Sequence, residues 1–97
     1  MDIPRLSAKE ALILRLLIGK GEMYGLELVN ESGSQLKRGT VYVTLGRMAD
    51  KGYVESRTVP QTDGSGIPKR LFQATGFGSR VLKTWELASA SFALGEA

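Results

Sequence analysis

Four side chains between residues 40 and 51 are of types that bind phosphates and base edges, and they follow one another at steps of four, three and four. They are Thr40, Thr44, Arg47 and Lys51. Such steps place side chains on one face of an α-helix. Hydroxyls and an ammonium group suit phosphate oxygens, and a guanidinium can form two hydrogen bonds to guanine. The chemistry that this face predicts is noncovalent recognition of a polyanion.

Covalent and metal chemistry have little support in the composition. The 97-residue chain contains no cysteine and no histidine. It therefore has no thiolate, no disulfide, and neither the commonest metal ligand nor the usual general base at neutral pH. We expect no enzyme, no metal site and no cofactor. No apolar run reaches membrane-spanning length and the N-terminus has no cleavage pattern, so a cytoplasmic protein is expected.

Positive charge is concentrated around the same face. Residues 37–71 hold seven Lys or Arg and three Asp or Glu. The rest of the chain holds six Lys or Arg and seven Asp or Glu. The segment thus carries +4 and the remainder −1, which gives the net +3. This distribution points to nucleic acid, and a solvated basic surface is the alternative.

The helix that carries these residues is expected over 37–51. Its apolar positions recur at helical spacing and form a predicted inward stripe of Val41, Tyr42, Leu45, Met48 and Ala49. Gly52 is placed to end the helix. Arg38 lies near the helix N-terminus, where backbone N–H groups also favour phosphate.

Two helices are expected before it. Ser7 and Glu10 form a capping-box pattern, so one helix should run from there to about Lys20. Its apolar residues cover most of the circumference, which predicts burial on several sides. A two-turn helix is expected over 24–31, ended by the Ser-Gly-Ser that follows.

A β-hairpin is expected over 54–75. The sequence YVESRTV alternates as a strand does, QTDGSG suits a turn of about eight residues that we expect to be mobile, and PKRLFQAT is typical of a returning strand. Lys69 and Arg70 begin the returning strand and would contact a DNA backbone. The alternative is that they only blunt an exposed strand edge.

A terminal helix over 77–94 carries a narrow apolar stripe of the coiled-coil type, formed by Phe77, Val81, Trp85, Ala88 and Phe92. A domain of this size cannot cover all of that stripe. We therefore predict a homodimer through Val81, Trp85, Ala88 and Phe92. Alternatively, the helix buries the stripe in its own subunit, or Trp85 stacks on a planar ligand.

This order of elements predicts an α+β fold, a winged helix-turn-helix of three helices and a β-hairpin wing, with a C-terminal dimerisation helix. Residues 1–75 would bind DNA and residues 76–97 would dimerise, as parts of one compact unit. The third helix lies in the major groove in such folds, and the wing contacts the flanking backbone. The predicted function is a dimeric, sequence-specific DNA-binding regulator. The alternatives are a protein-binding module without DNA binding and a small-molecule-responsive sensor.

The segments KRGTVYVTLGRMADKGYVESR and GIPKRLFQATGFG resemble PadR-type winged-helix transcriptional regulators. The resemblance covers about residues 8–90, and the matching positions are Gly39, Thr40, Tyr42, Leu45, Met48, Lys51, Gly52, Val54, Lys69, Arg70, Phe72, Thr75 and Gly78. It implies a dimeric repressor that often responds to small aromatic or cationic compounds, and it implies that Tyr42 contacts the DNA backbone.

The chain departs from the PadR pattern at two places. Gly46 stands where that family usually has a long polar residue, and Gly76 and Phe77 replace a charged pair. The resemblance is to the short members, so a second helical domain after the terminal helix is not expected.

Overall fold

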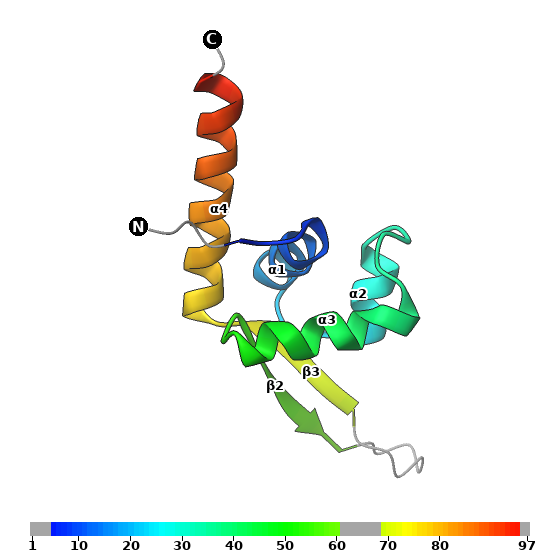
Figure 1. The fold of residues 1–97 in the computed structure, drawn as a ribbon. Coiled ribbons are helices and arrows are strands. Elements are labelled where there is room, and N and C mark those ends of the chain that lie inside the picture. Colours follow the sequence, from blue (N-terminus) through cyan, green and yellow to red (C-terminus); the bar gives the residue numbers. More distant parts are fainter. Residues whose placement is uncertain (1–4, 61–68, 96–97) are drawn as a thin grey trace.

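The computed structural model describes residues 5–60 and 69–95, and describes side chains in the last helix as far as residue 90. The elements are α1 (Ala8–Lys20), β1 (Met23–Tyr24), α2 (Gly25–Glu31), α3 (Arg38–Asp50), β2 (Val54–Val59), β3 (Lys69–Ala74) and α4 (Gly76–Gly95). Figure 1 shows α3 lying beside the hairpin of β2 and β3, with α1 and α2 behind it. The predicted α+β winged helix is confirmed. The hairpin loop expected to be mobile falls on residues 61–68, which lie outside the described part.

The three strands form one antiparallel sheet with β3 in the middle. β2 pairs with β3 from Val54 opposite Ala74 to Val59 opposite Lys69, and β1 pairs with the other edge of β3 through Met23 and Tyr24. β1 was not predicted, because two residues are too few to show an alternating pattern. It attaches the returning strand of the wing to the chain between α1 and α2.

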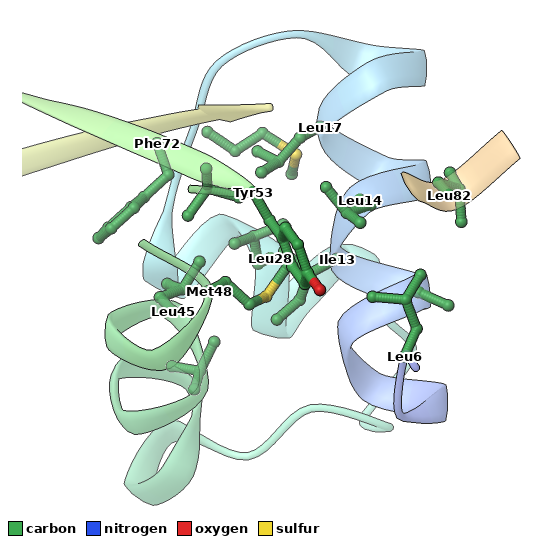
Figure 2. Close-up of a cluster of buried hydrophobic side chains, with 14 of the residues drawn as sticks. Leu6, Ile13, Leu14, Leu17, Leu28, Leu45, Met48, Tyr53, Phe72 and Leu82 are labelled. Atoms are coloured by element: carbon green, nitrogen blue, oxygen red, sulfur yellow. The ribbon is translucent and has the colours of Figure 1, made fainter. Parts of the chain in front are cut away.

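The core lies between α1, α2, α3 and the sheet. Figure 2 shows Leu14 and Leu17 of α1 facing Leu28 of α2, Leu45 and Met48 of α3, with Phe72 of β3 at one side. These side chains are all buried, together with others that include Ile13, Leu36 and Val41. The same cluster holds the inner side of α3, so the outer side of that helix is left to solvent.

The predicted inward stripe of α3 is too wide. Val41, Leu45 and Met48 are buried, but Tyr42 is 51% exposed and Ala49 is exposed as well. Each residue turns a helix by about 100°, so Tyr42 and Ala49 lie about a quarter turn from the centre of the buried side. Their placement in the core was wrong, because helical spacing alone does not say how far around the helix a small core reaches.

α1 begins as predicted. The Ser7 side chain accepts a hydrogen bond from the Glu10 backbone N–H at 3.1 Å, and the Ser7 N–H donates to Glu10 Oε1 at 2.9 Å. The helix ends at Lys20, before Gly21 with φ of +91°. Burial on several sides is only partly realised, since Ile18 is 47% exposed.

α4 is attached to the end of α3 at its first turn. The Thr75 hydroxyl donates to the Gly52 carbonyl at 2.6 Å and accepts from the Gly78 N–H at 2.8 Å. A Cβ at Gly78 would overlap the Tyr53 carbonyl, so the two backbones meet where only glycine fits. These contacts hold the start of α4 against the chain that leaves α3.

The first half of α4 packs within the subunit. Val81 is only 3% exposed and belongs to the hydrophobic core of its own subunit, so its predicted place in a dimer interface was wrong. Arg15 of α1 binds Glu86 at 2.9 Å and lies over the ring of Trp85, which is half-buried. The side chain of Phe92 falls outside the described part. In Figure 1 the last turns of α4 stand apart from every other element.

Candidate nucleic-acid interface

The outer side of α3 is the centre of the candidate interface. Thr40, Val43 and Arg47 are exposed there, with Gly39 and Gly46 between them. A helix places these positions roughly opposite its buried stripe. Thr44 is half-buried at one edge, and its hydroxyl donates to the Thr40 carbonyl at 3.2 Å. Of the predicted residues on this helix, Thr40 and Arg47 are thus exposed and Thr44 is exposed only in part.

Four exposed cations lie around this surface. Arg38, Arg47, Lys69 and Arg70 are exposed, and within residues 5–60 and 69–90 none of them forms a salt bridge. Pairing of Arg47 with Asp50, which would make it an ordinary surface arginine, does not occur there. Their charges are therefore available to phosphate groups.

Lys51 does not belong to this surface. α3 ends at Asp50, and the Lys51 ammonium lies 3.1 Å from Glu10 Oε2 and 5.7 Å from the centre of the Tyr53 ring. Its predicted position beside Arg47 was wrong. The Lys51 backbone still continues the helical turn, but its side chain is held by the Glu10 carboxylate on α1. We therefore remove Lys51 from the candidate contacts.

Glu10 joins the start of α1 to the end of α3 through that ammonium. Burial of Glu10 raises its pKa, but the hydrogen bond from the Ser7 N–H and the Lys51 ammonium outweigh burial and hold the pKa below its ordinary value. The carboxylate thus stays charged at neutral pH and ties two helices together.

An open cleft of about 360 Å³ lies where α2, α3 and the start of β3 meet. Its lining comprises Tyr24, Gly25, Leu26, Glu27, Asn30, Tyr42, Lys69 and Arg70. The cleft brings together three predicted contact residues from distant parts of the chain: Tyr42, Lys69 and Arg70. The α2 residues were not predicted, because the sequence pattern of that helix indicates packing only; Leu26 is 42% exposed and borders the cleft.

The Tyr42 ring lies against the backbone of Gly25, in space that a side chain at that position would occupy. A Cβ there would come within 2.5 Å of Tyr42 Cε1 and 2.8 Å of its hydroxyl oxygen. The Lys69 ammonium lies 5.3 Å from the centre of the Tyr24 ring, a cation–π distance. Two phenol rings and two cations therefore border one opening, an arrangement suited to a sugar and its phosphates.

The other strand of the wing, β2, is attached by an ion pair to the turn between α1 and β1. Arg57 Nε donates to Glu22 Oε2 at 2.8 Å, and a second guanidinium nitrogen donates to Oε1 at 3.1 Å. The hydrogen bond from Arg57 lowers the pKa of Glu22, and the Glu22 carboxylate raises the pKa of Arg57. Arg57 is thus engaged by a carboxylate, whereas Lys69 and Arg70 form no salt bridge with another residue of the described part of the chain.

Other kinds of site find little support in the described residues. Among them no group of three or more His, Cys, Asp and Glu side chains could hold a metal ion. None of the helices within residues 5–60 and 69–95 is long and apolar enough to cross a membrane. Ligand stacking on Trp85 remains a prediction.

Comparison with known proteins connects these features to one family. The sequence model of the transcriptional regulator PadR-like family matches residues 13–84. A PadR family transcription regulator from Clostridium difficile R20291 has a similar structure, with a TM-score of 0.70 and 25% identity over 93% of this chain and 97% of that one. A PadR family regulator from Eggerthella lenta DSM 2243 is similar with a TM-score of 0.73 and 25% identity, over 89% of this chain and 75% of that one.

A third similar structure contains DNA. Bacillus subtilis PadR in complex with operator DNA has a TM-score of 0.72 and 26% identity, over 81% of this chain and 47% of that one. The chain therefore spans about half the length of that relative. No curated protein matches the sequence.

Proposed function

The chain belongs to the PadR-like family of transcriptional regulators, and from this premise we propose that it binds double-stranded operator DNA as a homodimer and represses transcription. The observation that carries the proposal is the convergence of exposed cations from two elements, none of which forms a salt bridge within residues 5–60 and 69–90. Arg47 lies on the outer side of α3 and Arg38 at the start of that helix, and Lys69 and Arg70 of β3 line the adjoining cleft. A duplex lying along α3 would bring its phosphates to both.

In the proposed complex the two elements have different tasks. α3 lies in the major groove, where Arg47 binds guanine and Thr40 and Thr44 contact phosphates. Arg38 adds a phosphate contact at the start of the helix. Lys69, Arg70 and Tyr42 contact the flanking backbone, and their grouping around one cleft supports that assignment. Such contacts position the protein without selecting a sequence.

We propose that residues 1–75 bind DNA and residues 76–97 hold two subunits together. Trp85 and Ala88 are half-buried and continue the side of α4 that Val81 packs inward. Because the last turns of α4 stand apart from the rest of the subunit, that side is open to a second copy. The interface would comprise Trp85, Ala88 and Phe92, and a small aromatic effector would be bound beside Trp85.

Selection of bound sequences from a random duplex pool tests this function. We expect a palindromic site with half-sites about one helical turn apart. Affinity for the selected duplex should fall by about two orders of magnitude or more between about 50 and 200 mM salt, because several phosphates are neutralised. Absence of retention at both salt concentrations would contradict DNA binding and favour a protein-binding module.

A further inference from the structure

Val43 is an exposed aliphatic side chain at the middle of the outer side of α3. It is 53% exposed. Gly39 lies one turn before it and Gly46 one turn after it, and a Cβ built on either glycine meets nothing within 4 Å. The Val43 side chain therefore projects alone, with bare backbone on both sides along the helix.

The stability of the subunit does not explain this arrangement. Glycine is the poorest helix former after proline, and valine forms helices less well than alanine. Neither glycine lies at a positive φ, and neither is crowded by another element. A helix selected only for stability would carry alanine or long polar residues at such positions. The three residues suit a surface that a partner approaches closely.

We propose that Val43 contacts the C5-methyl group of a thymine in the major groove. The inference rests on the proposed function. The thymine methyl is the apolar group that base edges present in that groove. The short valine side chain can reach it only if the helix backbone lies close to the bases, and Gly39 and Gly46 permit that approach. Arg47, which is exposed one turn further along the same helix, attracts the duplex to this side.

The geometry also places the thymine relative to a guanine. Val43 and Arg47 are one helical turn apart, which is about 6 Å along the axis. Base pairs in a duplex are stacked about 3.4 Å apart. A thymine contacted by Val43 should therefore lie within about two base pairs of the guanine bound by Arg47.

Replacing thymine by uracil in the selected operator tests the contact, because uracil lacks only the methyl group. Each thymine is replaced in turn, and affinity is measured with the full chain. We expect one position in each half-site to lose about fourfold in affinity, the effect of one buried methyl group. Val43→Ala should bind the thymine and uracil duplexes equally. Ile18→Ala, an exposed aliphatic residue of α1, should discriminate as the unmodified protein does.

The outcomes separate this inference from the proposed function. If the protein binds no duplex, both the proposed function and the Val43 contact are contradicted. A protein that binds its operator but shows no sensitivity to uracil at any position overturns the Val43 contact and leaves DNA binding intact. The same conclusion follows if Val43→Ala keeps the full discrimination between thymine and uracil.

Discussion

At the scale of single residues, the outer side of α3 carries residues that lower helix stability and that we propose favour contact with DNA. Gly46 lies in open space inside the helix, where alanine would be the more stable residue. Gly46→Ala should therefore raise the free energy of unfolding by up to about 1 kcal/mol. It should also weaken binding to every duplex, because the added methyl group holds the backbone away from the bases. Thermal unfolding and operator titration measure the two effects, and an affinity that stays unchanged would contradict close approach at this position.

Arg47 is the residue expected to select a base through hydrogen bonds. Arg47→Ala should remove about 1–3 kcal/mol of discrimination at one base pair of each half-site. Competition among single-base variants of the selected operator measures this preference. Arg80→Ala is the matched control, because Arg80 is an exposed arginine that lies on α4 and not on the proposed DNA-binding surface. If discrimination among the variants is the same in both proteins, Arg47 contacts only phosphate.

Glu10 makes stability depend on pH in a defined direction. Its native pKa lies below the ordinary value of 4.5, so the carboxylate stabilises the fold above that pH and loses its contribution as pH falls through the native pKa. Glu10→Gln should unfold about 1 kcal/mol more easily near pH 7, and the difference should shrink near pH 3. Urea unfolding at both pH values measures it. A difference that stays constant would mean that Glu10 acts through packing and not through charge.

Predictions from sequence succeeded at residues whose partners are close along the chain. Ser7 and Glu10 form their capping box as expected, because the two residues are three apart. Lys51 was misplaced because its partner Glu10 is 41 residues away and no local pattern reports such a contact. Tyr42 was misplaced because the missing side chain at Gly25, in another helix, determines where its ring lies.

At the scale of elements, the same Gly25 links α2 to α3. The three atoms nearest to a Cβ at Gly25 all belong to the end of the Tyr42 side chain, which can rotate away at little cost. Gly25→Ala should therefore leave stability nearly unchanged and displace the tyrosine from its cleft, which weakens binding to all duplexes alike. Gly19→Ala, in open space on α1, is the control. Operator titration and thermal unfolding of both variants measure affinity and stability. If Gly25→Ala and Gly19→Ala bind the operator equally well, Tyr42 does not contact the DNA backbone.

The helices and the hairpin were predictable because caps, periodicity and turn residues are local signals. The junctions between elements were not. β1 is a two-residue strand that exists only through pairing with β3, and the Glu22–Arg57 ion pair joins residues 35 apart. Both attach the wing to the chain between α1 and α2. Contacts of this kind depend on the folded chain as a whole and leave no periodic trace in the sequence.

At the scale of the whole molecule, the proposed dimer depends on one side of α4. Ala88 is half-buried on the side that continues the inward stripe, whereas Ala90 is exposed and lies nearly opposite. Ala88→Glu should place a charge in the apolar interface and separate the subunits at micromolar concentration. Ala90→Glu adds the same charge and should leave the dimer intact. Sedimentation measures both, and a dimeric Ala88→Glu protein would contradict the interface.

The contacts at Thr75 and Gly78 fix the direction in which the long helix α4 leaves the domain. The helix extends about 30 Å from that point, so a change of about 10° in its direction moves the far end by about 5 Å. In the proposed dimer this displacement would change the separation of the two α3 helices. The spacing between operator half-sites could therefore diverge among related regulators through substitutions at this hinge alone, while every base-contacting side chain stays the same.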